Sequence, residues 1–177
     1  WTSAMRKVAP SLDVRAWPDS AGDLRDIRYC AAWLPPPNVV KGLPNLEVIF
    51  SLGAGVDAIL RDPTLPRHVP IVRVNDPDLT GRMTEYIVLQ VLMHHRQQRR
   101  IDANQRARIW DSFPTHAASA LSVGIMGLGV MGQDSAMKLA SLGFKVAGWS
   151  RARKHIAGVD CFAGEAEFDA FLARTDI

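Results

Sequence analysis

Cysteine is scarce in this 177-residue sequence, which has only Cys30 and Cys161, far apart and without a C-x-x-C pairing. The spacing predicts neither a disulfide framework nor a metal site, and both thiols are expected to be reduced and partly buried. Long apolar runs are also missing. None approaches the roughly 18 residues of a membrane span, and Trp1–Arg6 lacks the apolar core of a signal peptide. We therefore expect a cytoplasmic protein without a membrane partner.

No excess of positive charge is large enough to indicate a nucleic-acid partner. The formal net charge is +3 and the pI is about 9.1, and the cations are dispersed apart from residues 96–108 and 151–154. The first group lies on a predicted helix, where alternating cations are typical of a solvated face or a subunit contact. At 47% hydrophobic and 22% charged residues, the composition is that of a globular protein with one ordinary domain or two small ones.

The most informative segment is residues 122–151, which read as a strand, a glycine turn, a helix and a second strand. We expect strands at Ser122–Met126 and Lys145–Trp149, and a helix that continues through Ala136–Leu142 to Gly143. The turn between them has the G-x-G-x-x-G spacing of a dinucleotide-binding unit. This arrangement predicts a Rossmann nucleotide-binding domain in an α/β protein.

Each glycine of the turn has a chemical role in that interpretation. Gly127 permits the tight turn, Gly129 lets a pyrophosphate approach the backbone, and Gly132 lets the helix lie close to the strand. The helix N-terminus then offers free N–H groups to the phosphates. The alternative is that the glycines only allow tight packing. The predicted cofactor-binding residues here are Gly127, Leu128, Gly129, Val130, Met131 and Gly132.

A carboxylate is absent where an NAD site needs one, about 20 residues beyond the turn, to bind the ribose 2′-hydroxyl. The sequence has Ser150 and then the cations Arg151, Arg153 and Lys154 in this region instead. A hydroxyl and cations suit a 2′-phosphate, so we predict NADP(H) in preference to NAD(H). The alternative is a solvated basic turn.

The first half of the chain also alternates between strands and helices, which predicts a small parallel α/β domain. The proline run at 35–37 ends one strand and forces an extended loop. The expected strands are Leu12–Ala16, Tyr29–Trp33, Leu46–Ser51 and Ile71–Asn75, and the expected short helices are Ser3–Val8 and Asp57–Leu60.

Residues 78–110 are expected to form one long helix, polar in its second half, with Thr80 or Thr84 as its cap. Such a helix is a natural hinge between two domains. His94 and His95 are adjacent and point in different directions on a helix, which favours a structural or interface role over catalysis.

The phrase SLGAGVD, residues 51–57, is the second informative place. A strand ends at Ser51, and Gly53 and Gly55 leave the amides of a turn unobstructed, so the turn can bind a carboxylate. The alternative is a plain strand-to-helix turn capped by Asp57.

Taken in order, SLGAGVD, MTEYIVLQVLMHHR, VGIMGLGVMGQ and GWSR resemble the D-isomer-specific 2-hydroxyacid dehydrogenases, and within them the NADP-preferring glyoxylate and hydroxypyruvate reductases. The resemblance runs over nearly the whole chain. It implies a flavodoxin-like substrate domain (1–80), a hinge helix with a dimerisation arm (81–118) and a Rossmann domain (119–177). It also implies a homodimer that reduces a short 2-oxo acid to the D-2-hydroxy acid with NADPH.

The resemblance implies site residues as well. The backbone of Leu52, Gly53, Ala54 and Gly55 would bind the substrate carboxylate, and Trp33 would line the pocket. Met83 would lie near the cofactor, with Ser150 and Arg151 on its 2′-phosphate. The catalytic Arg, Glu and His of the family cannot be placed, and we expect them beyond Ile177. Both domains are therefore expected to be incomplete, and residues 1–177 alone to be unstable and inactive.

Two other functions stay open. The GLGVMG motif also resembles the start of β-hydroxyacid dehydrogenases, although about 120 residues precede it here. The same fold also suits a non-catalytic dinucleotide sensor that acts through partner proteins.

Overall fold

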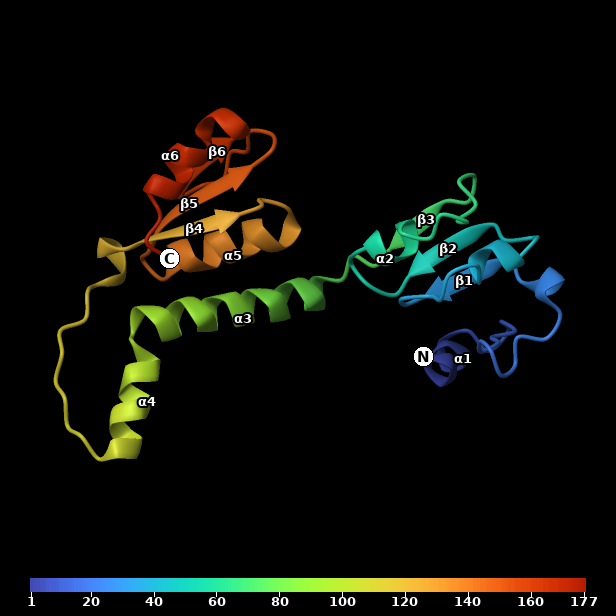
Figure 1. Ribbon diagram of the computed structural model, residues 1–177, viewed down its shortest axis with the longest axis horizontal. Helices are drawn as coiled ribbons and strands as arrows, with labels where there is room; N and C mark the ends of the chain where they lie inside the picture. The colour runs from blue at the N-terminus through green and yellow to red at the C-terminus, as the bar shows by residue number, and fades with distance from the viewer. The chain divides into compact units, whose positions relative to one another are not determined.

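The computed structural model describes residues 1–177 and divides the chain into two compact units, Trp1–Asn75 and Asp76–Ile177. Each unit has its own three-stranded parallel sheet and its own hydrophobic core (Figure 1). The predicted α/β class is confirmed. Cys30 and Cys161 are both unpaired and half-buried.

The first unit contains β1 (Tyr29–Ala32), β2 (Val48–Ser51) and β3 (Ile71–Arg73), in the order β1-β2-β3. Its helices are α1 (Thr2–Val8) and α2 (Asp57–Leu60), with 3₁₀ turns at Leu24–Asp26 and Val40–Gly42. Ile49 of β2 is fully buried in a core of aliphatic side chains. The other face of the sheet carries Tyr29, Phe50 and Val72, which are exposed.

The prediction of a strand at Leu12–Ala16 is wrong, because these residues form a bend and irregular backbone. Side-chain bonds hold the segment instead of a sheet ladder. Arg6 donates to the carbonyl of Val14 at 2.6 Å, and Arg15 pairs with Asp13 and Asp26 at 2.8 and 3.1 Å. Without a neighbouring strand, the backbone N–H groups of this short apolar run have no carbonyl acceptors across a sheet. Local polar bonds therefore determine its conformation.

The loop after β1 is fastened by Asp62. Its carboxylate accepts from the Thr64 hydroxyl at 2.7 Å and from the N–H groups of Thr64 and Asn38 at 2.9 Å each. Asn38 has a positive φ of 69°, which few residues other than glycine adopt. The Thr64 hydroxyl, followed by these two N–H groups, holds the pKa of Asp62 below its usual value.

We expect Asp62→Asn to lower the urea midpoint of the full-length protein at pH 7. A carboxyl whose folded pKa is lowered stabilises the fold above its unfolded pKa of about 3.9, and this stabilisation is lost as the pH falls through the lower folded value. The gap between wild type and variant should therefore narrow below about pH 4. Asp19, which is exposed and makes no such bonds, provides the control Asp19→Asn. Equal effects of the two substitutions at pH 7 would contradict the prediction.

The second unit begins with α3 (Pro77–His95) and α4 (Gln98–Ala107). Its sheet has the order β4-β5-β6, formed by Ser122–Met126, Lys145–Ser150 and Val159–Ala163. Helix α5 (Val130–Ser141) follows β4, and α6 (Phe168–Ala173) follows β6; 3₁₀ turns lie at Ala118–Ala120 and Glu165–Glu167. Val123 and Val146 pair in register, and with Val91 of α3 and Leu139 of α5 they form the core.

Two expectations about the long helix are wrong. The chain turns sharply at Gln97, whose φ is +52°, so that α3 and α4 are separate helices (Figure 1). The apolar face of α3 packs in the core, whereas α4 has no buried residue, so nothing in the core requires one straight helix. The cap of α3 is Asp76, whose side chain accepts from the Asp78 N–H at 3.0 Å, followed by Pro77 at N1.

The ring of His95 meets Phe144 edge-on, with 5.2 Å between centroids, which agrees with the structural role expected of it. His94 is exposed, and its role stays a prediction. The backbone of Asp176 and Ile177 lies beside the free edge of β4, where the Gly124 N–H donates to the Ile177 carbonyl at 2.8 Å. These two residues pair with β4 in this way without forming a regular strand.

Candidate functional site

The glycine turn between β4 and α5 has the geometry that its spacing predicts. Gly127 has a φ of +103°, and its N–H donates to the Trp149 carbonyl of β5 at 2.8 Å. A Cβ on Gly132 would lie 1.8 Å from the Gly127 carbonyl oxygen, so no other residue fits there without a shift of the backbone. The turn thus requires glycine at two positions, for two different steric reasons.

The N-terminus of α5 offers unpaired amides. Gly129 is its N-cap and has no side chain to bond the first turn, and the N–H groups of Val130, Met131 and Gly132 donate to no acceptor in the chain. No atom lies within 4 Å of where a Gly129 Cβ would stand, so the approach to these amides is open. Free amides and the helix dipole together favour an anion such as a pyrophosphate.

Leu128 differs from the other predicted residues of this turn, because its side chain belongs to the core. It is 2% exposed, and it packs so closely on Gly148 that a Cβ there would lie 2.6 Å from it. Only the backbone of Leu128 can face a ligand. The side chain of Val130, by contrast, is exposed.

The residues after β5 supply free cations. Arg151 and Lys154 are exposed and form no ion pair, whereas Ser150 donates its hydroxyl to the Ala152 carbonyl at 2.7 Å. Arg153 is already bonded within the chain, to the Cys161 carbonyl and to Glu167. No carboxylate stands at Ser150, the residue from which an NAD-type site would bind a ribose hydroxyl.

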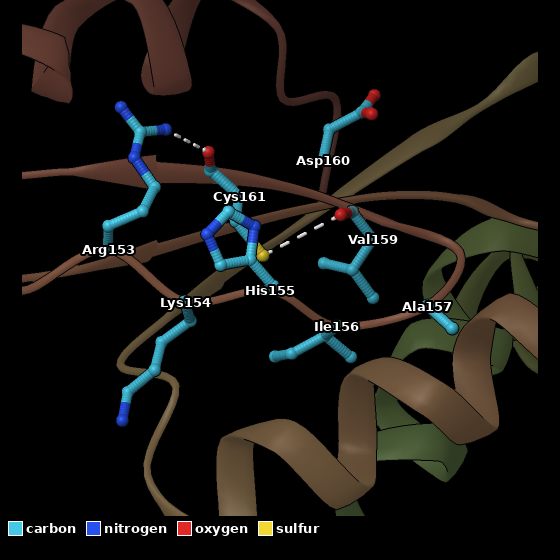
Figure 2. A pocket seen from close by; sticks show the side chains of 8 residues that line it. All are labelled: Arg153, Lys154, His155, Ile156, Ala157, Val159, Asp160 and Cys161. Atoms are coloured by element: carbon cyan, nitrogen blue, oxygen red, sulfur yellow. Dashed lines mark hydrogen bonds between the residues drawn. The ribbon is translucent and has the colours of Figure 1, made fainter.

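Two shallow hollows flank these cations. One, of about 380 Å³, is lined by Trp149, Arg151, Gly164, Glu165 and Phe168. Sequence reasoning missed residues 164–168, although Gly164, with a φ of +68°, ends a strand and accepts from the Trp149 indole at 2.8 Å. The other hollow, of about 430 Å³, lies along the crossover from β5 to β6 (Figure 2).

The SLGAGVD turn is held by Ser51, which is buried. Its hydroxyl lies 3.0 and 2.9 Å from the carbonyls of Gly53 and Gly55, and the Gly53 N–H lies 3.3 Å from the same oxygen. The Leu52 N–H donates to the Ala32 carbonyl at 2.9 Å. The amides of Ala54 and Gly55 donate to nothing in the chain, so both are free donors in this turn.

The Trp33 side chain lies against this turn. Its ring would be 3.3 Å from a Cβ on Gly53, and it remains 64% exposed. Glycine at position 53 therefore makes room for the indole. The alternative of a cap at Asp57 is wrong, because Asp57 is the first residue of α2 and Val56 is an N-cap without a side-chain bond.

Met83 lies on α3 and is partly exposed. Its neighbour Thr84 is buried and donates to Asp134 of α5 at 2.6 Å, and the Thr84 hydroxyl lies 3.3 Å from the Ser135 hydroxyl of the same helix. Polar bonds thus fasten α3 to the first half of the helix that begins at the glycine turn. No three histidine, cysteine or acidic side chains gather as a metal site would require, and no helix is both apolar and long enough to cross a membrane.

The comparisons with known proteins agree with this geometry. Residues 88–177 match the family model of the D-isomer specific 2-hydroxyacid dehydrogenase NAD binding domain. The whole chain is 37% identical to glyoxylate/hydroxypyruvate reductase A of Yersinia enterocolitica, and 97% of it is 37% identical to that of Serratia proteamaculans. The chain therefore belongs to the D-isomer-specific 2-hydroxyacid dehydrogenase family.

Solved structures support the same assignment. A D-isomer specific 2-hydroxyacid dehydrogenase from Xanthobacter autotrophicus, in complex with NADPH and MES, matches 99% of the chain with a TM-score of 0.91 and 37% identity. An NADPH-dependent glyoxylate/hydroxypyruvate reductase from Sinorhizobium meliloti, in complex with NADP and sulfate, matches 91% with a TM-score of 0.82 and 42% identity. The chain spans 58% and 56% of the two curated reductases, and 56% and 54% of these two structures.

Proposed function

We propose that the full-length protein that carries this chain reduces a short 2-oxo acid, such as glyoxylate or hydroxypyruvate, to the D-2-hydroxy acid with NADPH. The observation that carries the proposal is the combination of unpaired amides at the start of α5 with unpaired cations after β5. The free amides suit the pyrophosphate of a cofactor, and the free cations suit the 2′-phosphate of the same molecule. Bound NADPH would supply the hydride for C2 of the oxo acid.

In this proposal the residues of the chain bind and orient the cofactor and the substrate. The amides of Gly129, Val130, Met131 and Gly132 hold the pyrophosphate, and Arg151 and Lys154 hold the 2′-phosphate. The Ser150 hydroxyl joins them by turning from the Ala152 carbonyl to the 2′-phosphate. The free amides of Ala54 and Gly55 hold the substrate carboxylate beside Trp33, and Met83 lies near the cofactor. Positioning of the reactants contributes to the rate independently of any proton transfer. We assign no proton transfer to the histidines of this chain, which are His68, His94, His95, His116 and His155.

The same family membership suggests how the protein is divided into domains and how it assembles. We propose a substrate domain over residues 1–80, a hinge and arm over 81–118, and a dinucleotide-binding domain over 119–177, in a cytoplasmic homodimer. The exposed apolar side chains of Tyr86, Leu89 and Trp110, the last 97% exposed, support an interface along the hinge and arm. Membership of the 2-hydroxyacid dehydrogenase family argues against the β-hydroxyacid dehydrogenase alternative.

The experiment is a titration of the full-length protein with NADPH and with NADH, followed by turnover of glyoxylate and hydroxypyruvate. We expect NADPH to bind at least about tenfold more tightly, because the 2′-phosphate gains charge-assisted hydrogen bonds. Tighter binding of NADH would contradict the cofactor assignment. Cofactor binding without turnover of either acid would favour the non-catalytic sensor instead.

A further inference from the structure

Arg153 lies in the crossover from β5 to β6, between the two unpaired cations Arg151 and Lys154. Its guanidinium donates to the Cys161 carbonyl of β6 at 2.6 Å and pairs with the Glu167 carboxylate just before α6. The second carboxylate oxygen of Glu167 accepts from the Ala163 N–H at 2.7 Å. Arg153 and Glu167 thus join the crossover, the end of β6 and the start of α6.

The side chains of Arg153 and Lys154 point in different directions. Figure 2 shows Arg153 reaching toward the Cys161 carbonyl, whereas Lys154 extends away from it. The guanidinium donors of Arg153 therefore have acceptors within the protein. Although Arg153 belongs to the cluster of cations in the sequence, its position is that of a brace for the crossover.

Glu167 is suited to be the fixed end of this brace. The Ala163 N–H, and after it the Arg153 guanidinium, hold the pKa of Glu167 below its usual value, so the carboxylate is charged at neutral pH. Its two oxygens bond to two different elements, β6 and the crossover.

We infer that Arg153 and Glu167 are a positioning pair for cofactor selectivity, which hold Arg151 and Lys154 where a 2′-phosphate binds without contacting it themselves. The inference rests on the proposed function and names a further determinant of that same site. Hydrogen bonds to a charged group depend strongly on geometry, so cations on a loosened crossover would bind a phosphate less well. NADH lacks the 2′-phosphate, and its binding should not depend on the pair.

The test measures NADPH and NADH dissociation constants for variants of the full-length protein. We expect Glu167→Gln and Arg153→Gln to weaken NADPH binding by about threefold and about tenfold, while NADH binding stays within about twofold. The double variant should be no weaker than Arg153→Gln, because both substitutions remove the same interaction. Arg174→Gln is the matched control, since Arg174 forms a similar exposed ion pair with Asp160 outside the crossover.

The sign of the Glu167→Gln effect decides between two roles of Arg153. If Arg153 were itself a phosphate ligand, Glu167→Gln would free it and tighten NADPH binding, which would overturn the inference. Unchanged selectivity in both single variants, or equal weakening of NADPH and NADH, would overturn it as well. A wild-type protein without NADPH preference would instead refute the proposed cofactor, and the inference with it.

Discussion

Replacing Gly132 with alanine is expected to prevent the glycine turn from closing and to abolish NADPH binding. The new Cβ would stand 1.8 Å from the Gly127 carbonyl oxygen, which is far inside contact distance. The carbonyl cannot move freely, because the N–H of Gly127 is bonded to the Trp149 carbonyl on β5. We expect the free energy of unfolding to fall by about 3 kcal/mol or more, since a backbone atom and not a flexible side chain must yield.

The measurement is urea unfolding of the full-length protein with and without NADPH, and two other glycines serve as controls. Gly81 of α3 has open space around its Cβ position, so Gly81→Ala should be neutral or stabilise by up to about 1 kcal/mol. Gly129 also has open space and an ordinary φ of −74°, so Gly129→Ala should fold normally but bind NADPH at least about tenfold more weakly. A Gly132→Ala protein with wild-type stability would refute the steric argument.

The parts of the fold that the sequence predicts well are those determined locally. The strand, turn, helix and strand of residues 122–150 are confirmed, because the glycine spacing and the apolar periodicity act within a few residues. The strands β1, β2 and β3 are found within the predicted ranges, each shorter by one or two residues at an end. In these segments the local preference and the packing agree.

The parts that the sequence predicts poorly depend on partners distant along the chain. The break between α3 and α4 occurs where the core packing of α3 ends, which no periodicity within residues 78–110 shows. The burial of Leu128 depends on Gly148 across the sheet, and the bonding of Arg153 depends on Glu167. Sequence alone treats Arg151, Arg153 and Lys154 as one cluster, whereas the structure separates a bonded cation from two free ones.

Arg151 is therefore the residue whose loss should change selectivity most. It is unpaired, it follows β5 directly, and it lines the hollow with Trp149 and Phe168. A charge-assisted hydrogen bond contributes about 1.5 to 3 kcal/mol, so Arg151→Gln should weaken NADPH binding by about ten- to a hundredfold. NADH binding should be unchanged, because the substitution leaves the amides of α5 intact.

A second substitution, at Ser150, should reverse the preference for NADPH over NADH instead of only removing it. An aspartate at position 150 would accept a hydrogen bond from a ribose 2′-hydroxyl and repel a 2′-phosphate, so Ser150→Asp with Arg151→Gln should bind NADH more tightly than NADPH. Arg99→Gln, at an exposed arginine of α4 without an ion pair, controls for the loss of positive charge alone. If Arg99→Gln weakened NADPH binding as much as Arg151→Gln does, the preference for NADPH would come from the overall charge of the protein. If instead Arg151→Gln weakened the binding of both cofactors equally, Arg151 would contact a group that NADPH and NADH share.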